Sequence, residues 1–270
     1  MSFLFNLAAM SNFQFALDYL GHRLNAKTRH GVHSPFVYKL VDEVIYDFEP
    51  KSEYKNIEDL RKKLLRDERL IRITDLGAGS LINNNKQKQV KQIAKNALKP
   101  KKLAQLIYRL AKHQQPGNIV ELGTCLGITT SYLSKAVPQA KVITMEGCPQ
   151  TAEIAEENFS ALNLKNISLA VGNFDANLPK VIAEEQQLDF VFVDGNHRKD
   201  ATLNYFDWCL PKINENSLLI FDDIYWSQGM KEAWEQIKSH PDVTVTIDLF
   251  WIGLVFFKKG IAEEHFKIKF

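Results

Sequence analysis

The second half of the chain alternates short apolar segments with longer amphipathic ones, and this alternation constrains the fold more than any other feature. From residue 116 onward, each apolar segment has the length and composition of a buried strand, and apolar residues at helical spacing follow it. Such a rhythm forms a parallel sheet with helices on both faces. We expect strands at residues 118–122, 141–145, 167–171, 188–193 and 217–221, and helices near residues 127–137, 149–163, 176–186, 199–209 and 227–239.

The C-terminal end of this region departs from the alternation. The segments Val243–Asp248 and Trp251–Phe257 are both typical of strands, and a very short connection joins them. That connection leaves no room for a crossover helix, so the two strands must be antiparallel. The expected fold class is therefore α/β: a doubly wound, mostly parallel seven-stranded sheet that closes with an antiparallel pair.

Residues 1–115 differ, and we expect them to form a helical, basic extension to a domain at residues 116–270. Apolar residues at helical spacing predict one amphipathic helix after Ser34 and Pro35, and a charged helix at residues 57–69. The extension has 21 basic and 11 acidic residues, a formal charge of +10, whereas the remainder has 13 and 21, a charge of −8. This asymmetry fits two parts that dock on each other, solvated faces, or a basic surface for an anionic partner.

Two short segments of the extension have no assigned role. His30 and His33 lie close together beside Arg29, which suits a helix cap or a turn as well as a metal or substrate contact. Residues 73–80 contain two glycines after an apolar segment, like a cofactor-binding loop. The polar run that follows them favours a mobile segment or a lid on the substrate side instead.

Composition excludes several classes of protein. The three cysteines, Cys125, Cys148 and Cys209, form no C-x-x-C pair, which argues for a reducing compartment and against structural zinc. No apolar run is long enough to span a bilayer, and the N-terminus lacks the basic region of a signal peptide. We therefore expect a cytoplasmic protein without a membrane span.

The candidate site is at the ends of the strands, because ligands of open parallel sheets bind beyond the carboxyl ends. The first strand leads into two glycines that bracket a turn before a helix, whose free N–H groups can cradle a ligand. At the second strand end, the Glu146 carboxylate can accept hydrogen bonds from both hydroxyls of a ribose, and Phe174 can flank an adenine. Acidic, glycine or small polar residues follow the five strands at Glu121, Gly123, Gly127, Glu146, Gly147, Asn173, Asp194, Asp222 and Asp223.

In this order, the strand ends resemble the motifs of the class I S-adenosylmethionine-dependent methyltransferases, over residues 116–258. The terminal antiparallel pair is also similar to that family. Within it, the sequence looks like the small-molecule O-methyltransferases. The resemblance implies S-adenosylmethionine as cofactor and assigns its binding to Glu121, Gly123, Thr124, Gly127, Glu146, Gly147, Asn173, Phe174 and Asp194.

The resemblance also implies transfer of an activated methyl group to a hydroxyl of a small-molecule acceptor, so a base or a metal must assist loss of the hydroxyl proton. His197 is the best base candidate, beside Asp194, because the reference pKa of histidine lies near neutrality. Asp194, Asp222 and Asp223 form a hard oxygen site suited to Mg²⁺, although catechol-type members carry Asn in place of Asp223. The alternative is that Arg198 or Lys199 neutralises these carboxylates.

Two other functions stay open. The first is a methyltransferase that acts on RNA or another polyanion gripped by the basic extension; an Asn/Asp-Pro-Pro-aromatic motif and paired catalytic cysteines are both absent from the sequence. The second is a cofactor-binding protein that has lost catalysis. The sequence does not identify the acceptor, because acceptor pockets are built from variable segments, and it leaves a homodimer open.

Overall fold

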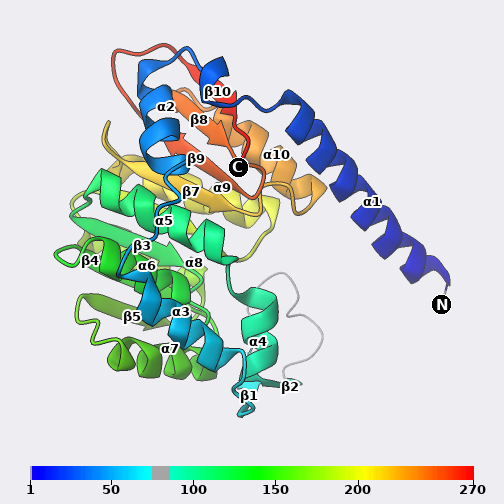
Figure 1. Cartoon of the computed structure of the whole chain (residues 1–270), viewed down its shortest axis with the longest axis vertical. Coiled ribbons are helices and arrows are strands. Elements are labelled where there is room, and N and C mark those ends of the chain that lie inside the picture. Colours follow the sequence, from blue (N-terminus) through cyan, green and yellow to red (C-terminus); the bar gives the residue numbers. More distant parts are fainter. Residues whose placement is uncertain (1, 75–85) are drawn as a thin grey trace.

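The computed structural model describes residues 2–74 and 86–270, with the backbone alone at residues 2–12 and 86. Its centre is an eight-stranded sheet with helices on both faces (Figure 1). The strand order is β10-β8-β9-β7-β6-β3-β4-β5. The strands are β3 (Asn118–Leu122), β4 (Lys141–Glu146), β5 (Ile167–Val171), β6 (Phe190–Val193), β7 (Leu218–Asp222), β8 (Val245–Asp248), β9 (Ile252–Phe256) and β10 (Glu264–Lys267).

Strands β3 to β7 are parallel, and β9 pairs antiparallel with both β7 and β8. The predicted α/β class, the five parallel strands and the closing antiparallel pair are thus confirmed. The eighth strand, β10, pairs parallel with β8 at the sheet edge and was not predicted. Its sequence, Glu-His-Phe-Lys, has a single large apolar residue, which is too weak a pattern to mark a strand.

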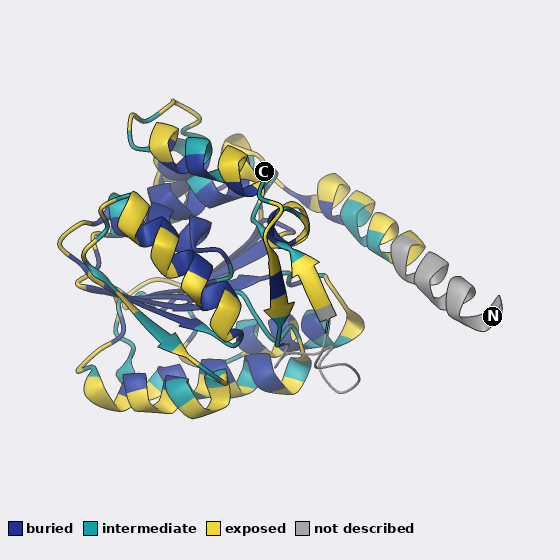
Figure 2. Ribbon diagram, turned by 90° about the horizontal axis from the view of Figure 1, so that it is seen from below, coloured by how far each residue is buried: buried dark blue, intermediate teal, exposed yellow. Residues whose placement is uncertain are grey.

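Helices cover the sheet in two layers. Helix α6 (Ile128–Ala136) packs on one face with α5 (Lys101–Gln114) from the N-terminal region, and one apolar cluster contains residues of both. The opposite face is covered by α8 (Phe174–Glu184), α9 (Lys199–Cys209) and α10 (Gln228–Lys238), which share the second cluster. Figure 2 shows the buried strands between these layers. Because α5 fills the same core as the sheet, the extension and the domain are packed as one body.

The rest of the N-terminal region runs over the sheet and toward its carboxyl edge. Helix α3 begins at Tyr54 and ends at Leu64, earlier than predicted, because the chain turns into a β-hairpin. Pro35 begins α2, as predicted, but the Ser34 side chain makes no capping hydrogen bond. The elements are α1 (Ser2–Asn25), α2 (Pro35–Leu40) followed by a π turn (Val41–Ile45), α3 (Tyr54–Leu64), β1 (Leu70–Ile73), β2 (Lys86–Gln89) and α4 (Val90–Ala97).

Helix α1 extends away from the body of the molecule (Figure 1). Near its C-terminal end the rings of Phe15 and Tyr19 pack on Phe250, with ring centroids 5.1 and 5.0 Å apart. His22 of the same helix is buried and its Nε2 lies 3.0 Å from Asp248 Oδ1, at the end of β8. No helix in the described ranges combines the length and apolar character needed to cross a membrane.

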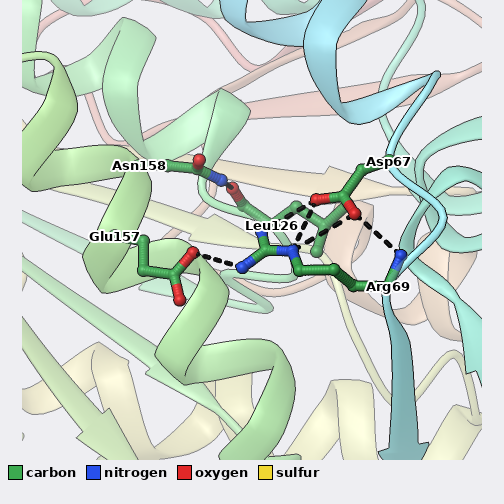
Figure 3. A network of polar contacts seen from close by, with 5 residues as sticks. All are labelled: Asp67, Arg69, Leu126, Glu157 and Asn158. Atoms are coloured by element: carbon green, nitrogen blue, oxygen red, sulfur yellow. Dashed lines mark hydrogen bonds and ion pairs between the residues drawn. The ribbon is translucent and has the colours of Figure 1, made fainter.

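An ion pair ties the N-terminal region to α7 (Pro149–Ala161), the helix after β4 (Figure 3). Arg69 contacts Asp67 through its guanidinium and donates from Nη1 to Glu157 Oε2 at 2.8 Å. The next residue of α7, Asn158, donates from Nδ2 to the carbonyl of Leu126 at 2.9 Å. One turn of α7 therefore holds both the hairpin region and the turn after β3.

The turn after β3 depends on a glycine at its first position. Gly123 has φ +103°, and an added Cβ would lie 2.0 Å from the carbonyl oxygen of Asp194. We predict that Gly123→Ala lowers the free energy of unfolding by about 3–5 kcal/mol, because strain and overlap add. Urea denaturation measures this. The control is Gly21→Ala in α1, which meets no atom within 4 Å and should change stability by no more than about 1 kcal/mol. Equal stability of the two variants would contradict the prediction.

Candidate functional site

A cavity of about 470 Å³ lies beyond the carboxyl ends of the parallel strands. Its floor comes from the strand ends and includes eight of the predicted site residues: Gly123, Glu146, Gly147, Asn173, Phe174, Asp194, His197 and Asp223. The N-terminal region supplies the opposite wall, from the β1–β2 segment, α4 and the connection between α4 and α5: Ile73, Thr74, Lys88, Gln92, Ile93, Asn96, Ala97 and Lys99. The cavity is therefore built jointly by both parts of the chain.

Three predicted cofactor residues do not line this cavity. The Glu121 side chain is completely buried and accepts hydrogen bonds from the hydroxyls of Thr130 and Thr144. The Thr124 hydroxyl also lies against Thr144, with 2.6 Å between the two oxygens. Gly127 precedes α6 with φ +75° and packs against α7. These residues fix the conformation of the turn after β3 from its buried side. Their effect on a ligand would therefore be indirect, through the position of the backbone of that turn.

Glu146 lines the cavity and fixes the same turn. Its Oε2 accepts from the backbone N–H of Cys125 at 2.8 Å, and its Oε1 accepts from that of Cys148 at 2.9 Å. Burial raises the pKa of the Glu146 carboxyl, and the backbone donors oppose that effect. Each carboxylate oxygen can accept a second hydrogen bond, so Glu146 still has acceptor capacity for a ligand in the cavity.

Phe174 stands at the start of α8, where it is placed by Asn173 and Gly195. The Asn173 side chain caps the helix by accepting from the Asp175 N–H at 2.8 Å. A Cβ on Gly195 would lie 2.7 Å from the Phe174 ring, so only glycine lets the ring approach this closely. The arrangement presents an aromatic ring at the cavity wall.

The remaining predicted residues meet in a cluster at the ends of β6 and β7. His197 Nε2 lies 3.8 Å from Asp194 Oδ1 and 3.8 Å from Asp223 Oδ2. Asp222 is fully buried beneath them. One ligand atom each from Asp194, His197 and Asp222 lies within 4.8 Å of the others, which is compatible with a metal ion.

A lysine from the N-terminal region completes this cluster. Lys99 Nζ lies 3.0 Å from Asp194 Oδ1 and also contacts Asp222 Oδ2. Lys199, one of the two cations expected here, instead pairs with Glu232 at 2.8 Å. Burial would lower the pKa of Lys99, but the charges of Asp194, Asp222 and Asp223 outweigh burial and raise it above its ordinary value. The ammonium is therefore charged at physiological pH.

Comparisons with known proteins identify the domain that carries this cavity. Residues 120–224 match a family model described as a methyltransferase domain. Over 118 residues the chain is 30% identical to a catechol O-methyltransferase of Niastella koreensis. The matched region is 43% of this chain and 52% of that protein. A catechol O-methyltransferase of Mycobacterium tuberculosis is 27% identical over 123 residues, or 45% of this chain and 54% of its own length. The chain thus spans about half the length of the curated relatives that it matches.

Solved structures agree on the fold. An O-methyltransferase from Bacillus cereus in complex with S-adenosylhomocysteine has a TM-score of 0.56 at 18% identity, over 80% of this chain and 94% of its own. An S-adenosylhomocysteine-bound methyltransferase of Podospora anserina has a TM-score of 0.58 at 14% identity, over 84% and 98%. Residues 120–224 thus match a methyltransferase domain, and the chain shares its fold with solved methyltransferases. The family inferred from the ordered strand ends is confirmed for this domain.

Sequence reasoning missed the wall that the N-terminal region gives to the candidate site, including Lys99, and it left two segments without a role. Lys99 stands in a lysine-rich stretch far from the strand ends, and no motif distinguishes it from its neighbours. His30 and His33 are exposed and do not line the cavity. Of the glycine-containing segment 73–80, Ile73 and Thr74 line the cavity, while residues 75–85 lie outside the described residues.

The buried Glu121, at the end of β3, predicts a specific pH dependence of stability. Burial raises the pKa of Glu121 to about 7 from its ordinary 4.5, so the folded protein keeps this proton to a higher pH than the unfolded chain. Stability should therefore fall by roughly 2–3 kcal/mol as the pH rises from about 4.5 to about 7. In Glu121→Gln this component should be absent. Urea denaturation of both proteins across that range measures the difference, and parallel pH profiles would contradict the prediction.

Proposed function

We propose that this protein transfers the methyl group of S-adenosylmethionine to a hydroxyl group of a small molecule. The observation that carries the proposal is the composition of the cavity. One half, at the ends of β3, β4 and β5, has the residues expected of a nucleotide site, and the other half contains the cluster of Asp194, His197 and Lys99. The sequence similarity to catechol O-methyltransferases, named above, supports a hydroxyl as the acceptor group. The cytoplasmic location and the domain boundary at residue 115 stay predictions, and a homodimer stays open.

The cofactor occupies the half of the cavity at the ends of β3, β4 and β5. Glu146 accepts hydrogen bonds from the ribose hydroxyls, and Phe174 packs against the adenine. Gly123 and Gly147 leave room for the cofactor beside the backbone, and Asn173 holds the start of α8. Glu121, Thr124 and Gly127 contribute by fixing the conformation of the turn.

The acceptor lies in the other half, between the cluster and the wall made by the N-terminal region. As the acceptor oxygen attacks the methyl carbon, the new C–O bond forms while the C–S bond breaks, and the sulfur keeps the bonding electron pair. The hydroxyl proton passes to His197 Nε2, which faces the carboxylates of Asp194 and Asp223. The negative charges of these carboxylates stabilise the imidazolium that forms, so the histidine is the base and the two aspartates assist it electrostatically.

Binding of the cofactor product tests the first half of the proposal. We predict that S-adenosylhomocysteine binds the wild-type protein and that Glu146→Gln weakens binding by about 1.5–3 kcal/mol, the scale of a charge-assisted hydrogen bond. Isothermal titration calorimetry measures both affinities. The control is Glu153→Gln, an exposed change on α7 that should leave the affinity unchanged. Binding of NAD in place of S-adenosylhomocysteine would contradict the assignment of S-adenosylmethionine as the cofactor.

Turnover tests the second half of the proposal, the transfer of the methyl group to a hydroxyl. We predict methyl transfer to members of a panel of catechols and other phenols, and a fall in kcat of about 10²–10⁴-fold in His197→Gln, since a positioned base contributes that much. The affinity for S-adenosylhomocysteine should be unchanged in this variant. Mass spectrometry of the products and calorimetry provide the two readouts. A His197→Gln enzyme with wild-type kcat would remove His197 as the base.

The alternative acceptor, RNA or another polyanion, makes a different prediction. Binding to the basic residues of the N-terminal region would weaken steeply as salt rises, because phosphate contacts release counterions. A gel-shift titration on single-stranded and duplex RNA at two salt concentrations distinguishes the two acceptor classes. Tight, salt-dependent binding together with inactivity on phenols would favour the polyanion.

A further inference from the structure

Lys99 is held rigidly where the N-terminal region meets the carboxyl edge of the sheet. It lies between α4 and α5, and its carbonyl accepts a hydrogen bond from Arg61 Nη1 of α3 at 2.8 Å. The next residue, Pro100, caps α5 through its own carbonyl, which accepts from the N–H groups of Leu103 and Ala104. The Lys99 side chain is only 12% exposed. Its backbone is therefore fixed on both sides while its ammonium reaches the carboxylate cluster.

The cluster needs a cation on electrostatic grounds. Asp194, Asp222 and Asp223 carry three formal negative charges, and Asp222 is completely buried. Adjacent carboxylates repel one another and cannot all stay ionised unless a positive group compensates them. Lys99 contacts two of the three, Asp194 and Asp222, which lie at the ends of the neighbouring strands β6 and β7.

The same oxygens are the ones a divalent cation would use. The predicted magnesium set contains Asp194 and Asp222, and Lys99 Nζ already lies against one oxygen of each. A Mg²⁺ ion needs ligand oxygens at about 2.0–2.1 Å in near-octahedral order, so the ammonium would stand within its coordination shell. With Lys99 in place, the residues present do not fit a magnesium ion.

We propose that Lys99 is a built-in cation that takes the place of a divalent metal in this active site. The ammonium has three N–H donors, of which two face Asp194 and Asp222. The third faces the cavity that Lys99 lines and donates to the acceptor oxygen as negative charge develops there. This inference rests on the proposed function, and it makes the methyl transfer independent of added metal.

Metal binding tests the inference without any need for turnover. The probe is Mn²⁺, followed by electron paramagnetic resonance on the protein saturated with S-adenosylhomocysteine. The wild-type protein should not bind the ion, whereas Lys99→Met should bind it, because the variant leaves the carboxylates uncompensated. The matched control is Lys91→Met on α4, which removes a surface ion pair with Glu68 and should behave as wild type.

Turnover gives the second readout. EDTA should leave wild-type kcat unchanged, and Lys99→Met should lower kcat by about 10²–10³-fold, the cost of one lost donor to a developing oxyanion. Added Mg²⁺ should restore part of that loss in Lys99→Met, and Lys99→Arg, which keeps the charge, should retain more activity than Lys99→Met. A structural defect alone would not respond to Mg²⁺ in this way.

The outcomes separate this inference from the proposed function. Tight Mn²⁺ binding by the wild-type protein, or loss of its turnover in EDTA, would overturn the role of Lys99 while methyl transfer stands. If no acceptor is methylated, the proposed function fails, but absence of Mn²⁺ binding to the wild type with binding to Lys99→Met still supports Lys99 as the replacement cation. If Lys99→Met does not fold, the two wild-type measurements decide alone.

Discussion

The cluster of acidic side chains at the ends of buried strands is the constraint on which this molecule depends. Apolar strands place Asp222 where water does not reach, and an isolated charge there is far too costly to persist. The compensating charge comes from Lys99, which the chain supplies from more than ninety residues earlier in the sequence. The N-terminal region is thus more than a covering layer: its position against the sheet is coupled to the charge state of the site.

The fold was largely predictable because its signals are local. Each parallel strand is a short apolar run followed by a helix of ordinary spacing, so both can be recognised within a window of about twenty residues. The hairpin of β1 and β2 and the edge strand β10 were missed for the opposite reason. Lys-Gln-Lys-Gln in β2 has no apolar face, and its pairing with Leu70–Ile73 spans a long stretch of chain that local patterns do not connect.

The two halves of the candidate site differ in how far local sequence patterns predict them. Residues of the cofactor half, such as Gly123 and Glu146, come directly after strands, and topology alone gathers them at one edge. What the sequence does not distinguish is whether such a residue faces the cavity or the core. Glu121 and Gly123 are two residues apart, yet one lies completely buried among threonines and the other borders the cavity.

The acceptor half depends on packing between distant segments, which explains why its chemistry resisted prediction. The sequence predicts that Asp194 and Asp222 converge, and they do, but it offers Mg²⁺ or the adjacent Arg198 and Lys199 as the cation that compensates them. The direction of the side chains determines which cation contacts the cluster. Lys199 points toward α10 and pairs with Glu232, so Lys99 contacts the carboxylates instead. A cluster of carboxylates therefore marks where a cation belongs, but whether that cation is a metal or a lysine depends on which segment packs over the strand ends. In this protein the N-terminal region places Lys99 over the strand ends and also forms one wall of the cavity. It therefore sets both the charge and the shape of the acceptor half.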